Sequence, residues 1–209
     1  MTILILSDLH LGLPKAPGHD WMLETMHRAA KQGCTGLIFA GDVIDRRCIS
    51  ETTYGQFADL NAVAVQLFQQ CLFVPGNHDA HVELSLPAEF IVAPDEFISL
   101  DFPDGTRVHT VGVSSDPDPR DVSDRMPSPS PNAPANLGIL HTSLNGSYSK
   151  SECLPISLET LNSSGYDAWA LGHVHQPIIE STHPPVRWVG MGNALVFDPE
   201  TKLLQSLDQ

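Results

Sequence analysis

The chain has 209 residues and an ordinary globular composition, in which 42% of the residues are hydrophobic and 17% are charged. It contains 11 Lys and Arg residues against 25 Asp and Glu residues, which gives a formal net charge of −14. This balance excludes a protein that passively coats nucleic acid and a polybasic membrane-surface protein, because both depend on basic residues that neutralise phosphates.

The first 80 residues alternate strand and helix patterns. Short apolar runs at 3–6, 37–40 and 71–74 are typical of buried strands. Apolar residues at helical spacing predict helices at 20–31 and 54–70 between these runs. Strands that alternate with helices predict βαβ units and a largely parallel sheet.

The middle of the chain has a different pattern. Short strands are predicted at 90–92, 97–100 and 107–113, the last of them after the turn signal Asp104-Gly105. Residues 114–136 contain six prolines and few apolar side chains, which predicts a long loop. Two interpretations of this Pro-rich loop are open: a disordered surface excursion, or a lid over a neighbouring site.

The last third of the chain returns to the earlier pattern. Strands are predicted at 137–140 and 168–171, with a short helix near 157–161 between them. Shorter strands are expected from there to the end. The apolar runs at 137–140 and 168–171 therefore add two predicted strand ends to the three in the first 80 residues.

Five of the apolar runs are followed at once by residues that can bind a metal. They are ILIL-Ser-Asp8-Leu-His10, LIFA-Gly41-Asp42, LFV-Pro-Gly-Asn77-His78-Asp79, GIL-His141 and AWAL-Gly172-His173-Val-His175. Sites in open α/β folds form beyond the carboxyl ends of strands, so these side chains converge if the five runs belong to one core. Each segment alone also fits a hydrogen-bonded histidine or a simple turn, but the combination predicts a site.

The types of ligand predict two metal ions. Imidazole, carboxylate and one amide, with no thiolate, suit Mn, Fe, Zn or Ni and disfavour Mg or Ca. Seven ligands are too many for one ion that keeps an open position, but they fit two ions that share a bridging carboxylate. Such a pair activates water and clamps a tetrahedral oxyanion, which is what hydrolysis of a phosphoester requires.

The order of the motifs resembles the calcineurin-like metallophosphoesterase superfamily. The segments that carry the resemblance are Asp8-x-His10, Gly41-Asp42-x-x-Asp45-Arg46, Gly76-Asn77-His78-Asp79, His141 and Gly172-His173-x-His175. The resemblance implies an α/β fold, a layered αββα sandwich of two mixed sheets flanked by helices. The stretches GILHTSLNG and SLETLNSSGYDAWALGHVHQP are in addition similar to the SbcD-type DNA repair exonuclease branch.

The resemblance also implies which residues hold each ion. The first ion would take Asp8, His10, Asp42 and His175. The second ion would take Asp42, Asn77, His141 and His173, so that Asp42 bridges the two. Of the divalent metals that suit these ligands we expect Mn, with Fe, Zn or Ni as alternatives.

Three further residues match catalytic positions of the superfamily. His78 matches the histidine that protonates the leaving oxygen or stabilises the transition state, a role suited to a side chain whose ordinary pKa is roughly 6.5. Asp45 and Arg46 match positions that orient this histidine and hold phosphate. A carboxylate at a helix start and a surface base are their plain alternatives. Asp79 is interpreted as a local cap or supporting residue and not as a ligand.

Two features differ from the SbcD-type nucleases. A capping domain generally follows their catalytic domain, whereas only residues 176–209 follow the last motif here, so we expect one catalytic domain over residues 1–209. Residues 83–124 carry ten acidic and two basic residues, which argues against processive digestion of duplexes. We therefore expect an exonuclease-like phosphodiesterase for nucleic-acid ends or nucleotide-type diesters, with weak nucleic-acid binding.

Two other hypotheses remain open. A small-molecule phosphodiesterase or phosphatase would act on cyclic nucleotides or a phosphorylated metabolite. A non-catalytic scaffold on the same fold would lose ligands, and above all the histidine of the GNH[DE] motif, which this chain keeps as His78. The sequence predicts a phosphodiester substrate and identifies no protein partner.

The cysteines and the N-terminal residues predict a cytoplasmic protein. Cys34, Cys48, Cys71 and Cys153 are widely spaced and none forms a CxxC pair, which predicts free, largely buried thiols in a reducing compartment. Met1 leads directly into the apolar run at 3–6 without a basic leader. No apolar run approaches the roughly 18 residues that a membrane span needs.

Overall fold

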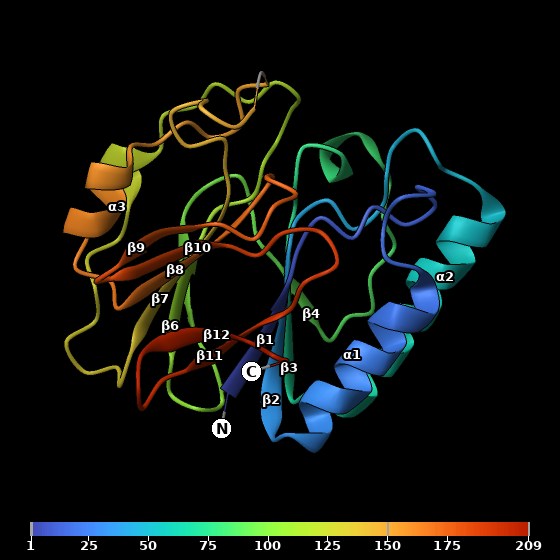
Figure 1. Ribbon diagram of the computed structural model, residues 1–209, viewed down its shortest axis with the longest axis horizontal. Coiled ribbons are helices and arrows are strands. Elements are labelled where there is room, and N and C mark those ends of the chain that lie inside the picture. The colour runs from blue at the N-terminus through green and yellow to red at the C-terminus, as the bar shows by residue number, and fades with distance from the viewer. Residues whose placement is uncertain (1, 150, 209) are drawn as a thin grey trace.

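The computed structural model describes residues 2–149 and 151–208, so Met1, Lys150 and Gln209 of the predicted domain lie outside the described residues. The chain forms two mixed sheets of six strands each, packed face to face (Figure 1). This architecture confirms the predicted α/β sandwich of two mixed sheets flanked by helices.

The first sheet has the strand order β12–β11–β1–β2–β3–β4. Its strands are β1 (Thr2–Leu6), β2 (Cys34–Ala40), β3 (Gln70–Val74), β4 (Phe90–Val92), β11 (Leu195–Asp198) and β12 (Leu203–Ser206). Strands β1 to β4 are parallel, whereas β11 is antiparallel to β1 and to β12. The helices α1 (His19–Lys31) and α2 (Glu51–Leu67) connect β1 to β2 and β2 to β3, which confirms the predicted βαβ units.

The second sheet has the strand order β5–β6–β7–β8–β10–β9. Its strands are β5 (Ile98–Asp101), β6 (Arg107–Thr110), β7 (Asn136–His141), β8 (Ala168–Gly172), β9 (Ile179–Thr182) and β10 (Pro185–Trp188). Strands β6, β7, β8 and β10 are parallel, and the two edge strands run antiparallel to their neighbours. The strand predicted over 107–113 ends at Thr110, because the next residues leave the sheet and the Val113 amide donates to the carbonyl of Pro75.

Alternate residues of the central strands face two different cores. Ile3 and Ile5 of β1 point into the space between the sheets, where they pack with Ile139 of β7. Leu4 and Leu6 face the other way, toward the apolar faces of α1 and α2. Figure 1 shows these two helices side by side on the outer face of the first sheet. Burial on both faces explains why the strands read as unbroken apolar runs.

Helix α2 begins three residues before the predicted start at residue 54. Ser50 caps it: its hydroxyl accepts a hydrogen bond from the Thr53 amide at 3.1 Å, and the Thr53 hydroxyl accepts one from the Ser50 amide at 2.8 Å. This reciprocal capping box satisfies two amides that would otherwise lack partners. Among residues 2–149 and 151–208, no helix combines the length and the apolar character that a membrane crossing requires.

The outer face of the second sheet is covered by one short helix and by loops. Helix α3 (Leu158–Ser163) packs on Trp169 through Leu161, and the Trp169 indole donates to the Leu161 carbonyl at 3.1 Å. The Pro-rich loop, which includes the single turn η2 (Ser123–Arg125), lies on the same face. Its residues Asp118 and Val122 are buried, so the loop is a packed part of this layer and not a surface excursion.

The cysteines are free thiols, as predicted. Cys34, Cys71 and Cys153 are buried, and Cys48 is half-buried. Burial raises the pKa of the Cys71 thiol to about 12, which keeps it protonated and unreactive at neutral pH.

The packing of Gly138 in β7 against Trp169 in β8 can be tested by substitution. A Cβ atom at Gly138 would overlap the ring of Trp169, which burial and its hydrogen bond hold in place. We expect Gly138→Ala to lower the free energy of unfolding by about 1–3 kcal/mol, as overpacking does elsewhere. Urea denaturation followed by circular dichroism measures this change.

The matched control is Gly55→Ala in α2. A Cβ atom there would meet no neighbour within 4 Å, and the position is exposed. Alanine should stabilise the helix by about 0.5–1 kcal/mol. Equal effects of the two substitutions would contradict the packing described for Gly138.

Candidate metal centre

The five predicted segments meet at the carboxyl ends of strands from both sheets. Strands β1, β2 and β3 contribute from the first sheet, and β7 and β8 contribute from the second (Figure 1). The loops after β1 and β2 are tied together, because the amides of Asp8 and His10 donate to the carbonyls of Gly41 and Asp42 at 3.0 and 2.9 Å. Convergence across two sheets therefore places all seven predicted ligands in one region.

The predicted ligands of the first ion form one cluster. The Nε2 atoms of His10 and His175 lie 3.0 Å apart. Oδ1 of Asp8 lies 3.9 Å from Nε2 of His175, and Oδ2 of Asp42 lies 3.7 Å from Nε2 of His10. His175 is the accessible member of this cluster, with half of its side chain exposed, whereas Asp8, His10 and Asp42 are buried.

The predicted ligands of the second ion form an adjoining cluster. Oδ1 of Asn77 lies 3.2 Å from Nε2 of His141 and 3.0 Å from Nδ1 of His173. Oδ2 of Asp42 lies 3.4 Å from Nε2 of His141. The same carboxylate oxygen therefore faces both clusters, while Oδ1 of Asp42 accepts a hydrogen bond from the His78 amide at 2.8 Å. This is the arrangement that a bridging ligand needs.

Backbone strain is concentrated at the ligands. Asp8, His10, Asp42 and His173 have φ angles of 54°, 42°, 55° and 100°, in a region that side chains other than glycine rarely adopt. Each such residue costs of order 1–3 kcal/mol and persists only where its surroundings enforce it. The positive φ angles turn these four side chains toward the predicted site soon after each strand ends. An unstrained backbone at these positions would continue in the direction of the strand.

Two glycines make room for the ligands. A Cβ atom at Gly41 would overlap Nδ1 of His141, and one at Gly76 would overlap Oδ1 of Asp42. The φ angle of Gly41 is also 91°, which glycine adopts without strain. The glycines of the sequence motifs are therefore required by the close approach of the ligands themselves.

The outward atoms of the imidazole rings have partners that orient them. Nδ1 of His141 lies 2.9 Å from the Ala40 carbonyl, which can only accept, so this nitrogen carries the proton. Nε2 of His173 lies 2.8 Å from the Ser149 hydroxyl. Such contacts fix the rings and leave the inward nitrogens, Nε2 of His141 and Nδ1 of His173, available as ligands.

The electrostatics of the cluster favour cations. Burial opposes the charged form of His141, but the nearby Asp42 carboxylate outweighs it and raises the pKa of His141 to about 9. Burial lowers the pKa values of His10 and of His173 to about 4, so both rings are neutral at neutral pH. Neutral imidazoles and ionised carboxylates are the forms that bind divalent metals, so His10 and His173 are ready to bind, whereas His141 must release a proton when a metal binds.

Asp79 supports the loops and is not among the ligands, as the sequence interpretation held. Its Oδ2 accepts hydrogen bonds from the amides of Asp42 at 2.7 Å and Gly76 at 2.9 Å. Its Oδ1 accepts a third from the Val43 amide at 3.2 Å. Asp79 is buried, so it joins the loop after β2 to the loop after β3 and holds Asp42 in place.

His78 lies at the edge of the two clusters. Its Nδ1 accepts a hydrogen bond from the Arg46 amide at 3.3 Å, so in the neutral ring the proton is on Nε2. Burial lowers the pKa of His78, which keeps it neutral at neutral pH. The ring is perpendicular to that of His10, with centroids 4.8 Å apart.

Asp45 and Arg46 are near the site, with contacts that the motifs did not indicate. The Asp45 carboxylate is buried and accepts two hydrogen bonds from the Arg47 guanidinium, at 2.9 and 2.7 Å. It lies 3.4 Å from Nδ1 of His10 and 3.7 Å from Nδ1 of His78. The alternative of a carboxylate at a helix start is wrong, because α2 begins at Glu51.

Sequence reasoning missed Asp116, which the Pro-rich loop brings to the edge of the site. Its Oδ2 lies 2.5 Å from Nη1 of Arg46, and its Oδ1 accepts a hydrogen bond from the Ser151 hydroxyl at 3.0 Å. Although burial opposes its charge, these contacts hold the pKa of Asp116 below its ordinary value. The loop thus forms a wall beside the site, and no local pattern in its sequence indicates this.

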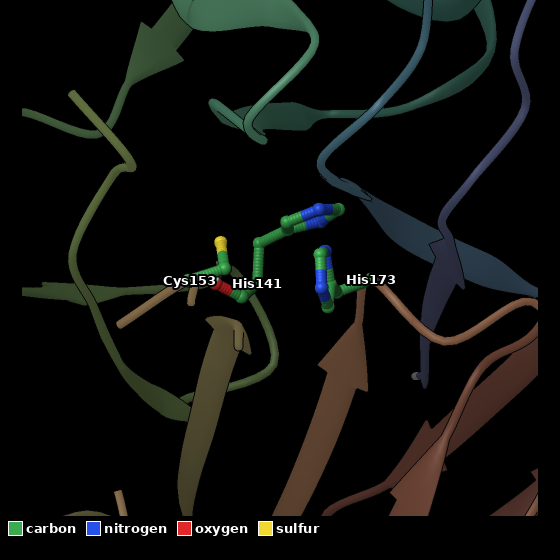
Figure 2. Close-up of side chains that lie close together, drawn as sticks. All are labelled: His141, Cys153 and His173. Atoms are coloured by element: carbon green, nitrogen blue, oxygen red, sulfur yellow. Dashed lines mark hydrogen bonds between the residues drawn. The ribbon is translucent and has the colours of Figure 1, made fainter. Parts of the chain in front are cut away.

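Cys153 lies near the second cluster without being a suitable ligand. Figure 2 shows the rings of His141 and His173 close to each other, with the Cys153 sulfur on the other side of the His141 side chain. The thiol lies 3.3 Å from the His141 carbonyl, to which it donates. Burial raises the pKa of Cys153 strongly, so it stays a protonated thiol and supports the backbone of β7.

The residues present fit two divalent metal ions. Ring nitrogens and carboxylate oxygens face one another at 3.0–4.0 Å, where groups that accept hydrogen bonds need a cation between them. The groups of three that could hold an ion include Asp8, His10 and His175, and also Asp8, Asp42 and His141. Donors that are all nitrogen and oxygen suit first-row transition metals.

Comparison with known proteins agrees with this geometry. The sequence model of the calcineurin-like phosphoesterase family matches residues 1–177. The chain belongs to this family. The resemblance seen in its motifs is therefore confirmed at the level of the superfamily.

A curated relative and several solved structures are similar to the chain. The uncharacterized metallophosphoesterase YhaO of Bacillus subtilis (strain 168) is 39% identical over 62 residues, which are 29% of this chain and 15% of that protein. A dimetal phosphatase from Danio rerio has a TM-score of 0.60 at 9% identity, over 93% of this chain and 92% of that one. Purple acid phosphatase PPD1 from yellow lupin has a TM-score of 0.60 at 12% identity, over 99% and 52%. At these identities the solved structures show the shared fold.

Replacing the shared carboxylate tests the two clusters. We expect Asp42→Asn to reduce Mn binding at both sites, because Oδ2 of Asp42 faces His10 and His141 together. The loss should exceed the roughly 10–100-fold that removal of an outer partner causes, and should exceed that of any single histidine change. Calorimetric titration of the metal-free protein with Mn measures affinity and stoichiometry.

Asp20→Asn is the matched control, since Asp20 is on the exposed surface of α1 with 96% of its side chain accessible. This control substitution should leave two tight Mn-binding sites. One unchanged tight site in Asp42→Asn would show that the carboxylate serves a single ion.

Proposed function

We propose that the chain is a dinuclear metal-dependent phosphodiesterase that acts, exonuclease-like, on nucleic-acid ends or nucleotide-type diesters. The observation that carries the proposal is the position of Oδ2 of Asp42, 3.7 Å from Nε2 of His10 and 3.4 Å from Nε2 of His141. One oxygen shared by two clusters is the geometry of a two-metal hydrolytic site. The complete ligand set and the retained His78 argue against a scaffold that has lost its chemistry.

The residues around the clusters supply the rest of the reaction. Two bound cations would neutralise charge on the phosphoryl oxygens and lower the pKa of a bound water. Neutral His78 carries its proton on Nε2 and can transfer it to the leaving oxygen, while the Arg46 amide holds Nδ1. The buried Asp45 carboxylate lies 3.4 Å from Nδ1 of His10 and 3.7 Å from Nδ1 of His78, and the Arg47 guanidinium holds it there.

Manganese is the metal that we propose for both positions. The donors are four imidazoles, of which those of His10 and His173 are neutral and that of His141 has a raised pKa, together with two carboxylates and one amide oxygen, and a protonated thiol lies nearby. Mn, Fe, Zn and Ni accept such nitrogen and oxygen donors. Cys153 lies close enough to His141 and His173 to be a possible third ligand, but its thiol donates to the His141 carbonyl, and a single cysteine favours Mn over a cysteine-rich zinc site.

The exonuclease-like branch is favoured by the sequence and by the access to the site. The stretches around His141 and His173 are those similar to SbcD-type nucleases. The half-exposed side chain of His175 leaves the first cluster open to a chain end. The net charge of −14 and the absence of any Lys/Arg cluster larger than Arg46-Arg47 in the sequence favour weak binding of nucleic acid. The four free thiols are consistent with the cytoplasm.

Hydrolysis of small phosphoesters is the second candidate, and one contact favours it. Arg46 is paired with Asp116 at 2.5 Å, so part of its charge is already neutralised and less is available for a polyanionic strand. A small diester needs little beyond the two cations for binding. The two candidates share the same chemistry and differ in the substrates that enter the site.

A substrate panel with Mn tests the proposal. We expect hydrolysis of bis(p-nitrophenyl) phosphate and release of nucleotides from the ends of short single-stranded oligonucleotides. A chelator should abolish both activities and added Mn should restore them. Cleavage of cyclic and aryl diesters without any cut oligonucleotide would favour the second candidate. An undiminished rate in the presence of the chelator would contradict both.

His78→Ala should keep both metals and lose most of its turnover. General acid catalysis contributes typically about 10²–10⁴-fold, and the loss should be smaller for nitrophenolate, a leaving group that needs no proton. Steady-state rates on an oligonucleotide and on an aryl diester measure the difference. His27→Ala on the exposed face of α1 is the control. A variant that binds fewer ions would place His78 among the ligands.

A further inference from the structure

Tyr148 presents an exposed aromatic ring beside the metal centre. Half of its surface is accessible, although it is a large hydrophobic side chain. It precedes Ser149, whose hydroxyl lies 2.8 Å from Nε2 of His173, a predicted ligand of the second ion. Tyr148 is therefore the immediate neighbour in sequence of a residue whose hydroxyl contacts a predicted metal ligand.

The ring is held in place by the edge of the second sheet. Trp188 of β10 is buried, and its ring is perpendicular to that of Tyr148 at 76°, with centroids 6.1 Å apart. Glu180 of β9 accepts a hydrogen bond from the Trp188 indole at 2.8 Å, and this carboxylate lies beside Tyr148, where it raises the pKa of the tyrosine hydroxyl. The buried Trp188, which Glu180 holds, thus supports one side of the exposed ring, and a tyrosine that packs on a fixed neighbour loses little conformational entropy when it binds a ligand.

Tyr148 and the metal ligands line the same cavity. The cavity has a volume of about 330 Å³, and its walls are Tyr148, Ser149, His173, Val174, His175 and Gln176. The volume is at the lower end of the range for small-molecule sites. A group in this cavity would contact the tyrosine ring while a phosphate attached to it reached His173 and His175. The Gln176 amide adds one donor group and one acceptor.

We propose that Tyr148 is the platform of a subsite on which the nucleobase next to the scissile phosphate stacks. The inference rests on the proposed phosphodiesterase function and specifies its substrate class as nucleotides. Every base has a flat aromatic face, so a tyrosine platform binds bases without selecting a sequence. Stacking also supplies affinity that does not depend on neutralising phosphates, which suits a chain of net charge −14 whose Arg46 is already paired.

Binding of a product analogue tests the subsite independently of catalysis. Thymidine monophosphate and deoxyribose phosphate differ only in the base, so the Mn-loaded protein should bind the first more tightly in a calorimetric titration. Tyr148→Ala should weaken binding of thymidine monophosphate about 5- to 100-fold, the range for loss of one stacking contact. It should leave binding of deoxyribose phosphate unchanged.

Two further variants separate stacking from a structural role. Tyr148→Trp keeps an aromatic face and should retain the preference for the base. Tyr54→Ala removes another exposed tyrosine, on α2, and should change neither affinity. Equal losses of both ligands in Tyr148→Ala, or equal affinities in the unsubstituted protein, would overturn the proposed subsite.

The subsite and the proposed function fail in different ways. Base-dependent binding that requires Tyr148, in a protein that hydrolyses no phosphodiester, would support the subsite and reject the function. Metal-dependent hydrolysis of diesters with no loss of thymidine monophosphate binding in Tyr148→Ala would reject the subsite and leave the function in place.

Discussion

The close approach of several hydrogen-bond-accepting groups around Asp42 is the constraint on which the rest of the structure depends. Oδ2 of this carboxylate lies within 3.7 Å of ring nitrogens from His10 and His141, and those rings are crowded by further histidines. Buried acceptors without donors are unfavourable, and divalent cations relieve the repulsion. Two divalent cations bound here would satisfy these acceptors and would supply the positive charge that phosphoester hydrolysis needs.

The fold supplies the force that holds these groups together. The two sheets bury apolar residues between them, so the carboxyl ends of strands from both sheets are fixed on one side of the molecule. Asp79 and the amides that it binds hold the loop of Asp42 against the loop of Asn77. The positive φ angles at Asp8 and at His10 are tolerated because this rigid frame enforces them.

The side chains around the two clusters favour weak but selective binding of a substrate. The cations would bind the phosphate, whereas Arg46 is shared with Asp116 and contributes less charge than its position suggests. The ring of Tyr148 offers an aromatic contact in the cavity that His173 and His175 also line. The proposed subsite would bind a phosphate together with the base attached to it, and such binding would depend little on the remaining length of a strand.

The sequence by itself determined the central strands of both sheets and the side chains that follow them. Apolar runs and the residues directly after them are local signals, so the route from Ile3 to Asp8, or from Ala168 to His173, can be read along the chain. Only the tertiary structure decided that Asp116 meets Arg46 and that Glu180 lies beside Tyr148. These contacts join loops and edge strands that are distant in sequence. Their residue types are common on any surface, so no periodicity or spacing marks them.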